Sequence, residues 1–385
     1  MDQQLIAVGE RIRSQMPPGL SQRRLAGLVD MTPDALSRAL NGQRGFSSIE
    51  LARIADSLGV DVYWLITGRE DPQRVDIAAR HVWDPVQAER VNPGREADDK
   101  ILERVVAVYR DAYPDGPPRS PDLPADPDAL RGRLGANFVR HFAGQIEAAF
   151  AIDVIRIPEL STDYSLRIGG RSVILLVSTP NWFRNNWSVA HELGHLVLGH
   201  HAGQGVEKAN EQPADDFAAR LLLPEQRMRE IKWSQLSEIE LAEFVWEAGV
   251  STEALRNRLR KLRIRLSAKV TAALGQPTQH LLRRHLPSTA SHDPAVDPVI
   301  EREAESTGRT FPLRLLADLS QRVRAGQADP AALAWLLDVP LDEIDFPEPD
   351  EDAASQQYEE VLAARPSAAA WKDRLAADPT NAAPR

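Results

Sequence analysis

The sequence predicts an α+β fold that is mostly helical, and three observations support this prediction. Apolar residues recur at helical spacing along much of the 385 residues, often just after Ser, Thr or Asp residues that can cap a helix. Strand-like runs lie between Val154 and Val177 and meet at Gly169-Gly170. A proline-rich segment, 114–127, precedes this mixed region. We therefore expect an N-terminal five-helix bundle, a central domain with a small antiparallel sheet, and a C-terminal helical region.

Residues 1–69 carry the pattern of the five-helix bundle. The first helix has an apolar side made by Leu5, Val8 and Ile12. The later helices are expected to begin at Ser21, Thr32, Ser48 and Asp61, and two of them to end at Asn41-Gly42 and Thr67-Gly68. The second and third helices, with the short turn between them, follow the helix-turn-helix plan.

The stretch L-S-Q-R-R-L-A-G-L-V-D-M-T-P-D-A-L-S-R-A-L-N-G resembles the XRE/Cro-repressor family of DNA-binding domains. The resemblance implies that DNA is contacted by Gln22, Arg23, Thr32, Asp34, Ser37, Arg38 and Arg44. Gln22 and Arg23 would contact phosphate, and Arg38 would read a guanine edge or lie near phosphate. Asp34 departs from the family pattern, which often has glutamine or another neutral residue here. A fold kept for protein contacts without DNA is the alternative.

Residues 70–128 are predicted to connect the bundle to the next domain. Periodicity fades after Glu70, and Pro72, Pro85 and Pro93 interrupt the sequence. A single helix is expected over residues 101–109, where apolar residues recur at a spacing of 3.6. The prolines of residues 114–127 predict a semi-rigid linker and the clearest domain boundary.

A second motif, His191-Glu192-Leu193-Gly194-His195, predicts a metal site. Two histidines four residues apart lie about 40° from each other around a helix and roughly 6 Å apart along it, so that both can reach one ion. Zinc takes nitrogen ligands of this kind, and catalytic sites use three protein ligands plus a water. Glu192 can reach that water without binding the metal, which is the general-base position of an H-E-x-x-H hydrolase.

A downstream helix, residues 210–224, offers a third ligand. Glu211 and Asp215 are four residues apart and therefore lie on one side of this helix. Glu211 can complete the metal shell, and Asp215 can accept a hydrogen bond from the second ring nitrogen of a ligand histidine. Alternatively, Glu211 would interact only with the helix dipole and Asp215 would be a solvated acid.

The run A-H-E-L-G-H, then E-x-x-A-D, then F-A-A-x-L-L-x-P resembles the ImmA/IrrE family of bacterial zinc metalloproteases. The resemblance covers about residues 130–270 and implies a zincin-like domain, 129–270, with a helix-turn-helix-like helical tail. It implies that His191, His195 and Glu211 hold Zn²⁺, with Mn²⁺ as an alternative ion, and that Glu192 is the catalytic base. Tyr164, His200 and His201 are left out of the catalytic set, because both histidines follow a predicted helix stop and are expected to point away from the metal.

The remaining residues are predicted to be a C-terminal helical region, 271–347, and a largely disordered acidic, alanine- and proline-rich tail, 348–385. Residues 287–298 are expected to form a linker. The turn-and-cap pattern around Thr32 recurs at Ser251 and again at Pro340. A basic run, 256–265, follows the second copy, and its arginines either contact DNA or are merely solvated.

Composition excludes several classes of protein. There are no cysteines, which excludes disulfides, cysteine zinc sites and the His/Cys/Cys site of nucleobase deaminases. The formal net charge of −10 argues against a generally basic nucleic-acid coat. No transmembrane run or signal peptide is evident, so a cytoplasmic protein without membrane partners is expected.

Together, these patterns predict a transcription-linked zinc endopeptidase that binds DNA through its N-terminal domain. The family resemblance implies that it cleaves a repressor or antitoxin-like protein to derepress stress or mobile-element genes, and the helix-turn-helix head implies a homodimer. The main alternative is a transcriptional regulator whose protease-like domain is a sensor or dimerisation module and cleaves nothing. A third is an antitoxin-type protein.

Overall fold

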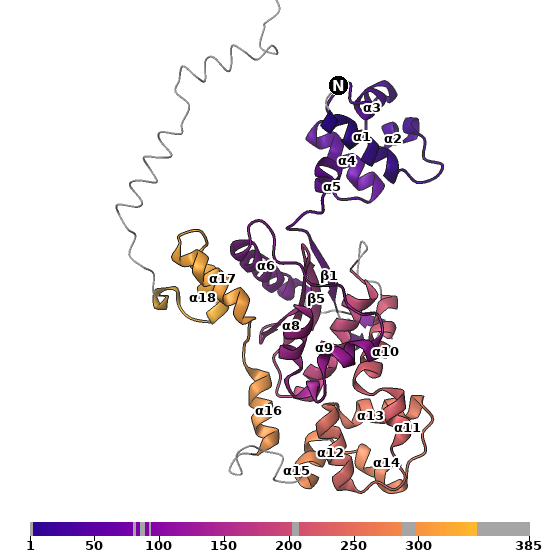
Figure 1. The fold of residues 1–385 in the computed structure, drawn as a ribbon, viewed down its shortest axis with the longest axis vertical. Helices are drawn as coiled ribbons and strands as arrows, with labels where there is room; N and C mark the ends of the chain where they lie inside the picture. Colours follow the sequence, from indigo (N-terminus) through magenta and orange to yellow (C-terminus); the bar gives the residue numbers. More distant parts are fainter. Residues whose placement is uncertain are drawn as a thin grey trace, which may run out of the picture.

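The computed structural model describes residues 3–79, 82–84, 89–91, 94–201, 208–286 and 297–344. Figure 1 shows an N-terminal helical bundle joined by one extended segment to a larger body that contains the sheet. The predicted linker at 287–298 lies mostly outside the described residues, and the predicted tail, 348–385, lies entirely outside them. No described helix is both long enough and apolar enough to cross a bilayer.

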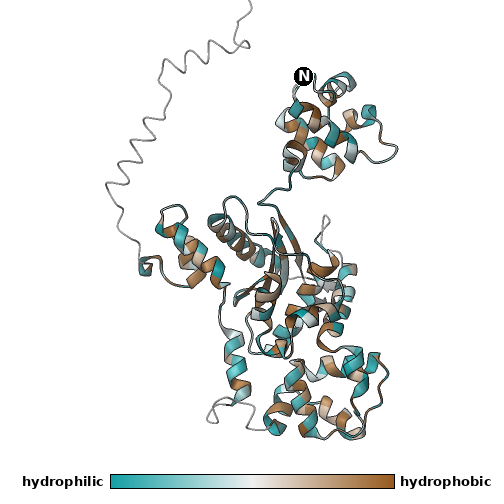
Figure 2. Cartoon of the chain, in the orientation of Figure 1, coloured by the Kyte–Doolittle hydropathy of each residue, from teal (hydrophilic) through white to brown (hydrophobic). Residues whose placement is uncertain are grey.

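The N-terminal bundle confirms the five predicted helices. They are α1 (Gln3–Gln15), α2 (Gln22–Leu28), α3 (Pro33–Leu40), α4 (Ser48–Leu58) and α5 (Val62–Thr67). Ile12, Leu25, Leu36, Ile54 and Leu65 are fully buried in a core that all five helices share. In Figure 2, hydrophobic and hydrophilic residues alternate along these helices, as amphipathic packing requires.

The turn between α2 and α3 is built by local hydrogen bonds. The Ser21 and Thr32 hydroxyls cap the two helices by accepting from the backbone N–H groups of Arg24 and Ala35. Asp30 takes a left-handed conformation, with φ of 56°, which redirects the chain. These contacts give the two helices the arrangement that the sequence predicts.

The sheet is mixed, and the prediction of an antiparallel sheet is wrong in this respect. Its order is β1 (Val75–Ala79), β5 (Tyr164–Ile168), β6 (Arg171–Val177) and β4 (Asp153–Ile157). The β5–β6 hairpin at Gly169-Gly170 is confirmed, but β4 pairs with β6 in parallel. The chain reverses twice between β4 and β6, so these two strands run in one direction and their direct pairing is necessarily parallel. A separate hairpin is formed by β2 (Val82–Asp84) and β3 (Glu89–Val91).

The segment predicted as a connector is partly built into the sheet domain. Strand β1 forms the edge of the sheet beside β5. The helix expected over 101–109 extends over α6 (Arg95–Ala112), and its apolar side, including Val105 and Tyr109, packs on the sheet. The prolines of this segment lie outside Val75–Ala79, so they do not interrupt the pairing of β1.

Helices cover both faces of the sheet. Alternate residues of β6 point to opposite sides, with Ile174 and Leu176 in one core and Val173 and Leu175 in the other. The first core is completed by α7 (Pro127–Leu134), η1 (Phe138–His141), α8 (Phe142–Phe150), α9 (Trp182–Leu198) and α10 (Glu211–Leu222). The second core is completed by α6, α17 (Leu313–Arg324) and α18 (Pro330–Leu337).

The remaining helices pack below α9 and α10 or beside the sheet (Figure 1). They are α11 (Glu225–Glu230), α12 (Glu238–Ala248), α13 (Thr252–Lys261), α14 (Ala268–Leu274), α15 (Thr278–His285) and α16 (Pro298–Thr307). The second turn-and-cap copy forms as predicted, because Gly249 is left-handed and Ser251 caps α13. The third copy is followed within the described residues only by a 3-10 turn, η4 (Leu341–Glu343).

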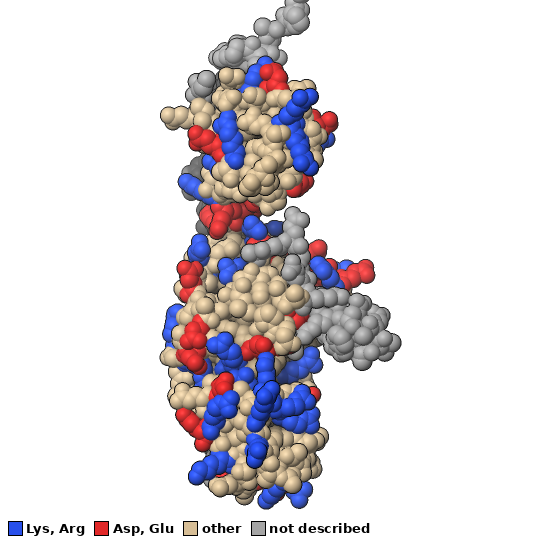
Figure 3. Space-filling model, turned by 90° about the vertical axis from the view of Figure 1, so that its right-hand side faces the viewer, with Lys and Arg blue, Asp and Glu red and all other residues tan. Residues whose placement is uncertain are grey.

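The basic run after α12 is largely exposed. Arg256, Arg260 and Lys261 lie on the surface, whereas Arg258 is buried and donates to the Leu223 carbonyl. In Figure 3, lysine and arginine side chains gather on the lower part of the face presented to the viewer. Arg258 therefore stabilises the fold, whereas Arg256 and Arg260 are exposed to solvent.

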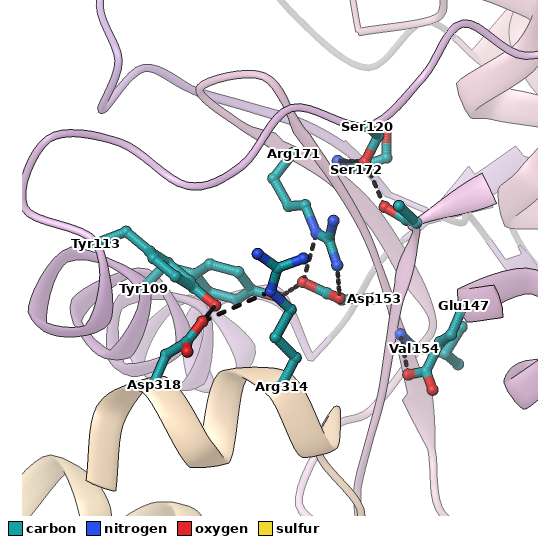
Figure 4. A network of polar contacts seen from close by, with 11 residues as sticks. Tyr109, Tyr113, Ser120, Glu147, Asp153, Val154, Arg171, Ser172, Arg314 and Asp318 are labelled. Carbon is teal, nitrogen blue, oxygen red and sulfur yellow. Dashed lines mark hydrogen bonds and ion pairs between the residues drawn. The ribbon is translucent and has the colours of Figure 1, made fainter. Parts of the chain in front are cut away.

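A buried polar network joins α6, β4 and β6 (Figure 4). Arg171 forms a two-pronged ion pair with Asp153, which also accepts a 2.6 Å hydrogen bond from the Tyr109 hydroxyl. Burial, and then the Asp153 charge, raise the pKa of Tyr109 well above its usual value. Next to this network, the Tyr113 hydroxyl donates to Asp318 of α17 at 2.7 Å, which ties the C-terminal helices to α6.

We expect Arg171→Leu to destabilise the sheet domain by about 3–5 kcal/mol, because it leaves the buried Asp153 carboxylate without its cation. The matched control is Arg229→Leu, which removes an exposed ion pair to Glu225 and is expected to cost about 0–1 kcal/mol. Urea unfolding, followed by tryptophan fluorescence, measures both. Equal effects of the two substitutions would contradict this account.

Candidate metal centre

Helix α9 places the first two candidate ligands. His191, Glu192 and His195 are all fully buried on this helix. The helix ends at Gly199, whose φ of 71° is left-handed and whose N–H bonds to the His195 carbonyl. The predicted helix, its stop and the common side of the two histidines are therefore all present.

Helix α10 approaches α9 closely enough to bring in a third side chain. A Cβ built on Gly194 would lie 3.1 Å from the Phe217 ring and 3.3 Å from the backbone of Ala214. The absence of a side chain at Gly194 and the small one at Ala214 let the two backbones pack at this short range. Glu211, at the start of α10, consequently reaches the histidines and is fully buried.

The three side chains converge on one point. The Nε2 atoms of His191 and His195 are 3.1 Å apart, and they lie 3.5 and 3.9 Å from the two Glu211 carboxylate oxygens. A tetrahedral ion with bonds of 2.0–2.1 Å needs ligand atoms about 3.3 Å apart. The residues therefore fit a divalent metal. Among the described residues, this three-residue group is the cluster with metal-binding geometry, and Glu192 is not part of it.

Each histidine is held at its other ring nitrogen. Nδ1 of His191 lies 2.9 Å from Asp215 Oδ1. Nδ1 of His195 lies 2.9 Å from Nδ1 of His200. The left-handed Gly199 turns the chain back over the last turn of α9, so His200 contacts the ring nitrogen of His195 that lies outside the metal cluster. Sequence reasoning missed this contact, and the glycine just before His200 was its only signal.

The other two side chains set aside in the sequence have partners elsewhere. His201 Nε2 lies 3.1 Å from the Ser165 carbonyl of β5. The Tyr164 hydroxyl donates to Asp98 of α6 at 2.7 Å. Neither group belongs to the three-residue cluster, so leaving them out of the catalytic set agrees with the contacts.

Burial keeps the histidines of this region neutral. Burial first, and then the neighbouring His191, lower the pKa of His195 to about 3. Burial also lowers the pKa of His200 and lowers that of His201 to about 4. A neutral imidazole is the form that binds a metal ion, so the site is poised for binding at neutral pH.

The residues predicted to contact DNA are placed unequally. Gln22, Arg23 and Arg38 are exposed on α2 and α3, and Ser37 is half-buried. Asp34 is also exposed and forms a 3.0 Å ion pair with Arg38 one turn away. The acid at this position therefore has a cationic partner on its own helix, which offsets its repulsion from phosphate.

Two of the side chains predicted to contact DNA make hydrogen bonds within the N-terminal bundle. The Thr32 hydroxyl caps α3. The Arg44 guanidinium donates to the Ala35 carbonyl at 3.2 Å and pairs with Glu50 at 2.5 Å. Arg44 thus joins the first turn of α3 to the first turn of α4 instead of extending into solvent.

We expect His200→Ala to weaken Zn²⁺ binding about 10–100-fold, because it removes the group that orients the His195 ring. Competition against a coloured chelator measures the affinity. His280→Ala, on α15, is the matched control and should bind Zn²⁺ as the unaltered chain does. An unchanged affinity of the His200 variant would show that its contact with His195 does not orient the ligand.

The metal-free protein should lose stability on acidification. Because the pKa of His201 is lowered to about 4 in the folded chain, the unfolded chain binds more protons between about pH 6.5 and pH 4. Stability is therefore full above pH 6.5 and falls with pH. Between pH 7 and pH 5 this histidine contributes a loss of about 2 kcal/mol. Urea unfolding in chelator should show this part of the loss disappearing in His201→Asn; an unchanged pH dependence would oppose the assignment.

Comparison with known protein families agrees with both domains. A family model described as an IrrE N-terminal-like domain, belonging to a peptidase family, matches residues 148–260, and a helix-turn-helix model matches residues 17–65. Searches of curated proteins and of solved structures find no match. The metal-binding cluster on α9 and α10 lies inside the first match, and α2 and α3 lie inside the second. The chain therefore joins an XRE-type helix-turn-helix domain to an IrrE-like peptidase domain.

Proposed function

We propose that this chain is a DNA-binding regulator whose central domain is a zinc-dependent endopeptidase. The observation that carries the proposal is the convergence of His191, His195 and Glu211 in a buried cluster. Glu192 is also buried and lies on α9 with the two histidines, but it is not part of this cluster. Three ligands and a separate carboxylate are what a catalytic zinc site requires.

In this proposal His191, His195 and Glu211 hold the ion. When bound, Zn²⁺ supplies a Lewis acid that polarises the substrate carbonyl and makes a neighbouring water more acidic. Asp215 accepts the Nδ1 proton of His191, and His200 accepts that of His195, so both histidines present Nε2 to the metal. His200 must then carry its own proton on Nε2.

Glu192 is assigned the proton transfers. Its carboxylate accepts a proton from the attacking water, whose oxygen forms a new bond to the peptide carbonyl carbon. When the carbon–nitrogen bond breaks, Glu192 passes the proton to the leaving amine. The products are a carboxylic acid and an amine, which become a carboxylate and an ammonium group when the acid proton passes to the amine, and Glu192 returns to its starting state.

The N-terminal domain supplies the link to transcription. The helix-turn-helix domain supports DNA binding, with Gln22, Arg23 and Arg38 as the exposed candidates for contact. We place a repressor or antitoxin-like protein as the substrate, because a peptidase attached to a DNA-binding head is brought close to other DNA-bound proteins. A homodimer, which lets two heads contact two half-sites, completes the proposal.

Glu192→Gln should reduce cleavage by about 10²–10⁴-fold while leaving Zn²⁺ stoichiometry unchanged, because it removes the base but no ligand. The full chain is added to a native cell extract, and new N-termini are identified by labelling and mass spectrometry. Asp216→Asn, an exposed acid on α10, is the control and should cleave normally. If no new termini depend on both Glu192 and metal, the domain is a sensor or dimerisation module and the endopeptidase proposal is wrong.

Arg23→Ala should weaken DNA binding across sequences and reduce the salt slope of the binding constant by about 1, as expected for a phosphate contact. Arg38→Ala should instead relax preference at one base pair if Arg38 reads a base edge. Binding of a selected DNA site is measured by fluorescence anisotropy at several salt concentrations. Arg104→Gln, on the exposed side of α6, is the control. Affinity unchanged in both test variants would remove DNA from the proposal.

A further inference from the structure

A cavity of about 340 Å³ lies away from the metal centre. Its walls are the junction of η1 and α8, the N-terminal half of α9, the Arg156 side chain of β4, and α16. Helix α16 is held against α9 by a hydrogen bond from Asn185 to the Ser306 carbonyl. The IrrE-like match ends at residue 260, so α16, which closes this cavity, lies beyond it.

The lining of this cavity carries an excess of positive charge. Arg140, Arg156 and Arg302 line it, against the single carboxylate of Glu305. Arg140 pairs with that carboxylate at 2.8 Å. Among the described residues, Arg156 and Arg302 have no carboxylate partner within 4.0 Å; each donates only to a backbone carbonyl, of Glu305 and Trp246 respectively. Neither guanidinium therefore forms a direct ion pair, although the Glu305 charge acts on both and the Glu301 charge acts on Arg302.

Arg302 is buried and its guanidinium lies over two tryptophan rings. It is 8% exposed, and its guanidinium lies 3.5 Å from the centre of the Trp246 ring and 4.7 Å from that of Trp182. Burial, and then the charge of Arg140, lower the pKa of Arg302 to about 9, and burial also lowers the pKa of Arg156. A cation held in low dielectric without a partner is costly, unless a ligand supplies the missing charge.

Three hydrogen-bond donors of the residues that line the cavity have no partner in the described part of the chain. The Nε atoms of Arg156 and Arg302 and the indole Nε1 of Trp182 are buried and have no hydrogen-bond partner among the described residues. Each of these groups can donate but cannot accept. The start of α8 is also in the wall and has no side-chain cap, so the positive end of its dipole contributes to the same field.

We propose that this cavity binds a small dianionic ligand, of the phosphate monoester class, between α9 and α16. Two unpaired guanidinium groups match a ligand group with two negative charges, and forked N–H donors suit phosphate oxygens. The volume of about 340 Å³ admits a small metabolite. The site shares no residue with the metal cluster, so this inference does not depend on peptidase activity.

Calorimetric titration of the full chain with inorganic phosphate, at constant ionic strength and pH 7.5, tests the proposal. We expect one saturable site per chain that binds phosphate at least tenfold more tightly than acetate. Arg156→Gln and Arg302→Gln should each weaken phosphate binding at least tenfold. Arg110→Gln, an exposed arginine of α6, should leave it unchanged.

Arg156→Gln is the decisive variant, because Arg302 also packs between tryptophans and its loss can disturb the fold. Circular dichroism and thermal unfolding without phosphate identify a variant that has failed to fold. Phosphate binding equal in the Arg156 and Arg110 variants would overturn the proposal, since the anion would then be held by general surface charge. Equal affinity for acetate and phosphate, or no saturable binding, would overturn it as well.

Discussion

The short distance between α9 and α10 is the constraint on which the site depends. Gly194 lies between the two histidines in sequence, and it is also the residue that α10 contacts through Ala214. A Cβ at Gly194 would require Phe217 and Ala214 of α10 to shift by a few tenths of an ångström. The motif from His191 to His195 thus supplies two ligands, and its glycine allows the close packing of α10 that brings Glu211 to them.

The sheet and its second layer of helices hold this helix pair in position. One face of the sheet carries α8 and α9, and the other carries α6, α17 and α18, which lie outside the IrrE-like match. The Tyr109–Asp153 hydrogen bond links α6 to β4, and the Tyr113–Asp318 hydrogen bond links the end of α6 to α17. The segments before and after the matched region are therefore structural parts of the domain that carries the metal cluster.

Sequence reasoning succeeded where a local period fixes geometry. The spacing of His191 and His195, and that of Glu211 and Asp215, places each pair on one side of a helix, and the caps of α2 and α3 fix their turn. It failed where the fold depends on distant pairing. Nothing local indicates that β4 lies beside β6, that β1 is an edge strand, or that Arg302 of α16 reaches the cavity beside α9. The contact of His200 with His195 was missed because helical angles cannot be continued past a left-handed glycine.

The most direct test of this account is anomalous X-ray diffraction at the zinc edge from crystals of the full chain grown with Zn²⁺. The account predicts one strong peak at about 2.0–2.2 Å from the Nε2 atoms of His191 and His195 and from the Glu211 carboxylate. Zinc bound elsewhere, or a Glu211 side chain turned toward solvent while the histidines hold the ion, would contradict it.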